Sequence, residues 1–191
     1  MPKTITPAAL FTDAALRRTQ EITADSYGSV WIGPSGEESS GEAVARHLEG
    51  TAALLDKDGW SRVTTYFRDR DRDEDQASDA NPADDESLTV KQMIRAVLRF
   101  LHDGIDTELD PRRTLDAALH QVGEDGGHGD PDTARVASGV LDRLIQAHTG
   151  SASVRATAWS ERQHRTHADI TALLRAGARF ARTYGPAPQA T

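Results

Sequence analysis

The stretch A-W-S-E-R-Q-H-R-T-H-A-D-I-T-A-L-L-R-A-G-A-R-F-A-R, residues 158–182, decides the fold. Its second half carries apolar residues at a spacing that puts them on one side of an α-helix. Thr166 and Asp169 have the spacing of a capping box, which predicts that the helix begins there. Gly185 followed by Pro186 predicts its end, with Gly185 in the left-handed conformation. The apolar side comprises Ile170, Leu173, Leu174, Gly177, Phe180, Ala181 and Tyr184.

A helix with one apolar side must cover a core supplied by the rest of the chain. With 191 residues, of which 37% are hydrophobic, the chain is long enough for one domain with a modest core. It has no cysteine, which excludes disulfides, thiolate metal sites and a cysteine nucleophile. No apolar run approaches the ~18 residues of a membrane span, and no signal-peptide pattern opens the chain. We therefore expect a cytoplasmic protein without a membrane partner.

Five further helices follow from apolar periodicity and from start and stop signals. Thr6-Pro7, the capping box from Ser39 to Glu42, Asp110-Pro111 and Asp130-Pro131 are predicted to start four of them. Gly59-Trp60 and Gly150 are expected to end helices, the first in a Schellman arrangement. The predicted helices span 8–22, 42–58, 88–102, 111–123 and 131–150. The fold class predicted is a mainly α, compact bundle of about six helices.

Two short segments have the alternation of β-strands. Residues 27–32 are aromatic and β-branched, and residues 62–67 alternate apolar and polar side chains. Together they predict one short two-stranded hairpin beside the helices.

The negative charge of the chain is concentrated in one segment. Residues 68–86 hold nine acidic residues and three arginines without apolar periodicity, whereas the whole chain has a net charge of -8. This composition predicts a mobile acidic loop. The expected organisation is a flexible N-terminus over 1–6, one helical domain over 7–67 and 87–185 interrupted by the loop at 68–86, and a flexible tail over 186–191.

Trp159-Ser160-Glu161-Arg162, followed by Arg165-Thr166 and the closing helix, resembles the C-terminal signature of a family of uncharacterised small actinobacterial and actinophage helical domains. The Leu48–Trp60 segment resembles the opening element of that family, and residues 87–101 resemble its middle helix. Ser160-Glu161 stands where the family has Asn-Asp. The resemblance implies a small, mostly helical domain and implies no activity.

The residues before the closing helix form the first candidate site. Trp159, Glu161, Arg162 and Arg165 have the chemistry of a pocket rim that holds an anion; the alternative is that Trp159 packs on the helix and Glu161 pairs with a neighbouring arginine. A metal site is the less favoured interpretation, because a His-x-x-His pattern without further context is common. Its ligands would be Glu161, His164, His167 and Asp169.

Arg175, Arg179 and Arg182 form a basic stripe on the polar side of the closing helix. Arginine suits bidentate contact with carboxylate or phosphate, so the stripe is a candidate surface for an acidic protein partner or for nucleic acid. The alternatives are a solvated face and an intramolecular contact with the acidic loop.

The sequence shows no nucleophile–base motif, so we assign no catalytic residue, no metal and no cofactor. We expect a non-enzymatic interaction or accessory protein of an actinobacterium or its mobile element, with a protein as its partner. One alternative is a small enzyme or ligand-binding domain with its site between Trp159 and His167. The other is a nucleic-acid-associated protein that uses the arginine stripe.

Overall fold

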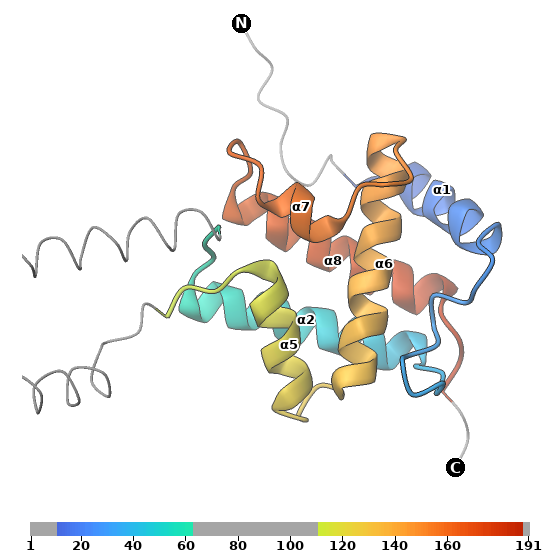
Figure 1. Ribbon diagram of the computed structural model, residues 1–191, viewed down its shortest axis with the longest axis horizontal. Coiled ribbons are helices and arrows are strands. Elements are labelled where there is room, and N and C mark those ends of the chain that lie inside the picture. The colour runs from blue at the N-terminus through green and yellow to red at the C-terminus, as the bar shows by residue number, and fades with distance from the viewer. Residues whose placement is uncertain (1–10, 63–110, 189–191) are drawn as a thin grey trace, which may run out of the picture. The chain divides into compact units, whose positions relative to one another are not determined.

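A computed structural model describes residues 11–62 and 111–188 of the chain. This part contains helices and no β-strand, which confirms the predicted mainly α bundle (Figure 1). None of the described helices combines the length and the apolar character needed to cross a membrane. The helices are α1 (Asp13–Ala24), α2 (Gly41–Asp58), α5 (Leu115–Glu124), α6 (Pro131–Thr149), α7 (Ala156–Ser160) and α8 (His167–Tyr184).

The centre of the bundle is the contact between α2 and α8, and α6 crosses both helices (Figure 1). Gly177 allows this close packing, because a Cβ atom there would lie 2.8 Å from Cδ2 of Leu141 and 2.9 Å from Cδ1 of Leu48. The apolar side predicted for α8 is buried, with Tyr184 only partly so. The apolar residues whose spacing predicts the inner sides of α2 and α5 are buried as well: Val44, Leu48, Ala52, Leu55, Leu115, Leu119 and Val122. Each fully buried Leu, Ile or Phe side chain contributes roughly 1.5–3 kcal/mol.

Several helix ends match the prediction. The Thr166 hydroxyl accepts from the Asp169 N–H, and the Asp169 carboxylate accepts from the Thr166 N–H at 2.9 Å, which completes the capping box. Asp130 caps α6 by accepting from the Thr133 N–H at 2.7 Å, with Pro131 as the first helical residue. Gly150 ends α6 in the left-handed conformation with a φ of 70°.

Three predicted starts are wrong in position. Helix α1 begins at Asp13, because the Thr12 side chain accepts from the Ala15 N–H; Phe11 lies before the helix. Ser40, rather than Ser39, caps α2. Helix α5 begins four residues after Pro111, where the Thr114 hydroxyl accepts from the N–H of Ala117. In each case a hydroxyl able to reach the third backbone N–H decides the start. The Thr6-Pro7 signal lies outside the described residues.

The apolar pattern of the first helix predicts a buried side of Leu10, Phe11, Ala14 and Ile22, which is wrong in part. Phe11 is buried, Ile22 is only partly buried, and Leu10 lies outside the described residues. Leu16 and Thr19 are buried, whereas Ala14 is exposed. Thr19 satisfies its hydroxyl within the helix by donating to the Ala15 carbonyl at 2.8 Å. A threonine can therefore occupy a core position here without an unpaired polar group.

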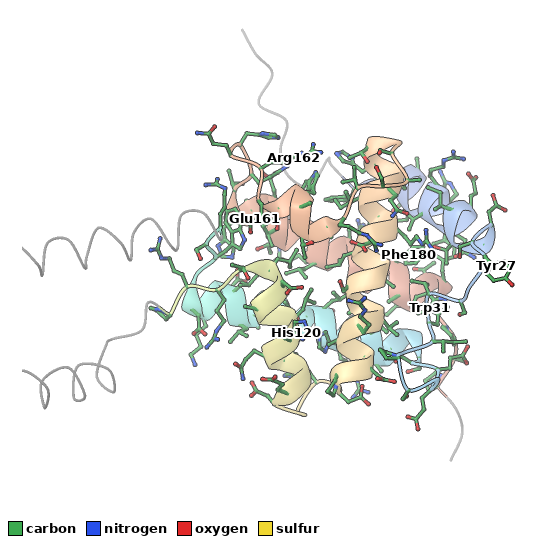
Figure 2. The ribbon with its side chains drawn as sticks, viewed as in Figure 1. Tyr27, Trp31, His120, Glu161, Arg162 and Phe180 are labelled. Carbon is green, nitrogen blue, oxygen red and sulfur yellow. The ribbon has the colours of Figure 1, made fainter. Side chains whose placement is uncertain are left out.

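The predicted strand over 27–32 is not formed. Tyr27 projects from a turn at the edge of the bundle, and Ile32 makes an isolated bridge to Glu38 (Figure 2). The aromatic residue that suggested a strand, Trp31, is instead a core anchor stacked on Phe180 with 6.0 Å between ring centroids. The proposed partner strand lies outside the described residues beyond Arg62.

The chain after α2 pairs with the chain before α5. Gly59 has a positive φ of 87° but an extended ψ of 155°, so the predicted Schellman turn is replaced by an exit into an extended segment. Ser61 N–H donates to the Arg113 carbonyl, and Arg113 N–H donates to the Gly59 carbonyl, both at 3.0 Å. Arg113 Nε also lies 2.9 Å from Asp58 Oδ2. The acidic segment 68–86 and the predicted helix 88–102 lie outside the described residues.

Candidate functional site

A half-open groove with a volume of about 520 Å³ runs along the first three turns of α8. Helix α8 supplies most of its wall, α2 contributes one carboxylate, and the residue before α1 closes part of it. We call it the α8 groove; it is lined by Phe11, Asp56, His167, Ala168, Thr171, Ala172, Arg175, Ala176 and Arg179.

The floor of the α8 groove is made of small side chains. Ala168, Ala172 and Ala176 recur every four residues, so they lie one above the other on the same side of the helix. Phe11 is buried and packs edge-on to Trp159, with 6.2 Å between ring centroids. Because alanine projects little from the helix axis, another helix can approach the α8 backbone closely along this line.

The charged groups of the groove differ in how well they are paired. His167 Nε2 lies 3.3 Å from Asp56 Oδ1. Arg179 donates from Nη2 to the Phe11 carbonyl at 2.8 Å, and its Nη1 lies 3.9 Å from an Asp13 carboxylate oxygen. Arg175 is exposed and has no hydrogen bond or ion pair to any described residue. The uncompensated charge of the groove is therefore positive.

The predicted arginine stripe is divided in the structure, because Arg182 belongs to another contact. Its Nε lies 3.0 Å from Glu42 Oε2 and its Nη2 lies 2.9 Å from Glu49 Oε2, both on α2. These hydrogen bonds raise the pKa of Arg182 and lower the pKa values of Glu42 and Glu49. Arg182 therefore joins α8 to α2, and only Arg175 and Arg179 line the groove.

The residues that precede α8, from Trp159 to Arg165, pack closely against one another. Trp159 is fully buried, and the Arg165 guanidinium lies 3.9 Å from the centroid of its ring. Burial is the main cause that lowers the pKa of Arg165. Arg62 donates from Nη2 to the carbonyls of Gln163 at 2.9 Å and Arg165 at 2.7 Å. This geometry matches the packing interpretation of Trp159 more closely than an open aromatic wall.

Helix α7, which carries Trp159, was not predicted. Asp142 of α6 fixes its start, accepting from the Ala156 N–H and from Arg155 Nη1, each at 2.7 Å. The Asp142 side chain is nearly buried, so it acts as a fixed point for the chain after α6. Sequence periodicity gives little signal for a helix of five residues.

The remaining predicted site residues lie on the turn between α7 and α8. Glu161 is partly buried and Arg162 is exposed there (Figure 2). Of the four candidate metal ligands, Asp169 is used in the capping box and His167 faces Asp56, while His164 is exposed. Within residues 11–62 and 111–188, no three potential His, Asp or Glu ligands are grouped to hold a metal.

Sequence reasoning missed the alanine floor and two of its neighbours. The four-residue recurrence of alanine on the polar side of α8 was an available signal for a second, weakly apolar face. Phe11 and Asp56 carry no such signal, since they reach the groove only through the packing of α1 and α2 against α8.

Comparison with known proteins gives a family but no activity. No curated protein and no solved structure matches the chain. A family model does match residues 39–180, from the start of α2 nearly to the end of α8, and so includes every groove residue except Phe11. The expected membership of an uncharacterised family is thus confirmed: the chain belongs to the family of unknown function DUF6197.

Proposed function

We propose that this protein is a non-enzymatic interaction protein that docks a helical segment of a partner protein in the α8 groove. The observation that carries the proposal is the unpaired Arg175 above a floor of alanine side chains. The partner segment places an apolar side on the floor and an acidic residue opposite Arg175.

The chemistry of the groove favours this occupant over others. A helix seated on Ala168, Ala172 and Ala176 buries apolar surface with little change in α8, because the floor is already formed. A carboxylate opposite Arg175 gains a charge-assisted, bidentate hydrogen bond. The groove is lined by nine residues, fewer than the roughly 20–30 residues that each side of a standard protein interface contributes, which supports a transient complex rather than a permanent one.

His167 Nε2 lies 3.3 Å from Asp56 Oδ1 without a hydrogen bond of good geometry. This approach favours the small-enzyme alternative, because a histidine beside a carboxylate is an arrangement that general bases use. The nearby hydroxyl is that of Thr171, which also lines the groove. No hydrogen bond joins Thr171 to His167 in the described structure, so the contact expected between a nucleophile and its base is not formed. We therefore rank an enzymatic role below docking.

Nucleic-acid binding by the arginine stripe is less favoured, because two of the three arginines have partners within the protein. Arg182 is occupied by Glu42 and Glu49, and Arg179 is held by the Phe11 carbonyl. Of the three stripe arginines only Arg175 is left without a partner among the described residues, so the stripe provides few phosphate contacts. Retention on DNA at low salt that is abolished by Arg175→Glu would favour this role instead.

Site-specific photo-crosslinking in the native host tests the docking proposal. A photoreactive residue at Thr171, which lines the groove, is compared with one at Arg135, which is exposed on α6. We expect a product specific to Thr171 whose crosslinked peptide, identified by mass spectrometry, is an amphipathic segment with an acidic residue. Arg175→Glu and the groove-filling Ala172→Leu should each reduce it at least ~10-fold, whereas Arg135→Glu should not.

Three outcomes would overturn the proposal. These are equal crosslinking from both positions, a product insensitive to Arg175→Glu, and a crosslinked peptide without acidic residues. A peptide from a second copy of this chain would replace the partner with self-association.

A further inference from the structure

His47 is a buried histidine whose ring is not paired. Its side chain on α2 is fully buried, and neither ring nitrogen has a hydrogen bond of good geometry. Buried polar atoms in native proteins are nearly always paired, so an imidazole in this state points to a specific role. His47 lies outside the α8 groove and takes no part in the docking proposed above.

The cover over His47 is the glycine-rich turn between α5 and α6, residues 125–130. A Cβ atom on Gly129 would lie 3.3 Å from Nδ1 of His47, so the backbone of the turn contacts the imidazole directly. The ring of His128 lies on α2 one turn further along, since a Cβ on Gly50 would be 2.9 Å from its Cδ2. Gly126 and Gly129 have φ values of 66° and 132°, which side chains larger than hydrogen disfavour.

The turn over His47 is held in place by few buried contacts. Residues 124–128 are exposed and Gly129 is partly exposed, so little apolar area holds the turn down. Segments with few buried contacts open locally at a lower free energy than the core. The His47 side chain is the part of α2 that such an opening would expose to water.

The groups around His47 disfavour a charge on it while the turn is closed. Burial is the largest cause and lowers the pKa of His47. The backbone of Leu119 on α5, the backbone of His128 and the carboxylate of Asp130 at the start of α6 act in the opposite direction, and the His128 ring lowers the pKa further. The Asp130 carboxylate is already committed to the Thr133 N–H, so it is a weak counter-ion for the ring.

We propose that residues 125–129 form a proton-operated latch over α2, in which protonation of His47 releases the turn. In the closed state the neutral ring tolerates burial, whereas a protonated ring is a buried charge beneath the turn and beside His128. The backbone of Leu119 and His128 and the Asp130 carboxylate offset the cost of burying that charge only in part. Opening the turn hydrates the imidazolium. Because the open state binds the proton more strongly, the closed state is favoured near neutral pH and is lost as the pH falls below about 6.5, the ordinary pKa of histidine.

Hydrogen exchange of the full chain at pH 5.0 and pH 7.5, corrected for the intrinsic pH dependence of exchange, tests the latch. We expect protection of residues 124–130 to fall at pH 5.0, by a factor that approaches tenfold for each unit by which closure lowers the His47 pKa. Protection within α6 and α8 should stay unchanged. An equal loss of protection in every helix would mean global unfolding and would overturn the proposal.

Two variants assign the effect to His47. His47→Leu replaces the titrating imidazole with an apolar side chain that can fill the buried position, and should abolish the pH dependence of residues 124–130. The matched control is His120→Gln on α5, an exposed histidine 3.9 Å from Asp116, which should leave the pH dependence intact. A pH dependence that persists in His47→Leu would contradict the latch. Should this variant not fold, NMR titration of the wild-type imidazoles decides, since a His47 pKa at or above 6.5 overturns the proposal.

Discussion

Gly41 and Gly185 lie against each other where α2 begins and α8 ends. A Cβ atom on Gly41 would lie 2.9 Å from the Cα of Gly185 and would collide with the Ala181 carbonyl. The Gly41 N–H donates to the Pro186 carbonyl at 2.9 Å, which holds the two chain segments in contact. Gly185 is extended at this contact, with a φ of -77° and a ψ of 163°, so the left-handed end predicted for α8 is wrong.

We predict that Gly41→Ala destabilises the protein by about 1–3 kcal/mol, because the added methyl group meets backbone atoms that cannot move aside without shifting α8. Urea denaturation measures the change. Gly28→Ala is the control: nothing lies within 4 Å of its Cβ position, so its effect should stay within about 0.5 kcal/mol. Equal effects of the two substitutions would show that the contact between Gly41 and Gly185 is not tight in solution.

The sequence predicted the elements whose signals are local. The Thr166 capping box and the Asp130-Pro131 start depend on side chains three residues or fewer from the backbone they cap, and both are confirmed. The predicted start of α1 is wrong because Thr6-Pro7 and Thr12 are both good N-cap signals, and apolar periodicity does not distinguish between them.

The parts that could not be predicted depend on residues far apart in the chain. Trp31 looks like a strand residue until the ring of Phe180 is placed beneath it. The arginine stripe looks continuous until Glu42 and Glu49 are seen to take Arg182 out of it. Neither contact can be predicted from the spacing of nearby residues, because each joins residues more than 100 positions apart.

Asp142→Asn should destabilise the protein by about 1.5–3 kcal/mol, since it replaces charge-assisted hydrogen bonds to Arg155 and to the Ala156 N–H with weaker ones. Loss of this fixed point should also loosen α7, which carries Trp159. Thermal unfolding measures the first effect, and the near-ultraviolet circular dichroism of the tryptophans reports the second. Asp116→Asn, at an exposed position of α5, is the control; a loss of stability that it shares would contradict a specific role for Asp142.

Arg182→Gln should lower the melting temperature near pH 7, because it removes the link from α8 to Glu42 and Glu49. The pKa values of both glutamates are lowered in the folded state. Their contribution is therefore present above the unfolded value of about 4.5 and is lost as the pH falls below it. The difference between wild type and variant should shrink at pH 3 and in 1 M salt.

The comparison for Arg182 is Arg18→Gln, which breaks an exposed pair with Glu21 within α1. A pair between neighbouring residues on one helix does not join two helices, so its removal should have the smaller effect at pH 7. A difference between wild type and Arg182→Gln that is unchanged from pH 7 to pH 3 would contradict the assigned role of the glutamates.

Replacing residues 63–110 with a short Gly/Ser linker should leave the described helices folded. One compact unit of the chain ends at Arg62 and resumes at Arg112. Ser61 and Arg113 are hydrogen-bonded neighbours, so the two ends lie close enough for a linker of about six residues, which spans roughly 20 Å. The described helices also bury one continuous apolar core among themselves.

Circular dichroism and denaturant unfolding of the shortened protein measure this outcome. We expect helical content and a single cooperative transition, as small single domains show. In the shortened chain, Arg113→Ala removes the ion pair with Asp58 that fixes the junction, and should cost more stability than the exposed substitution Arg135→Ala. A shortened protein without a cooperative transition would show that the described core needs residues 63–110 in order to fold.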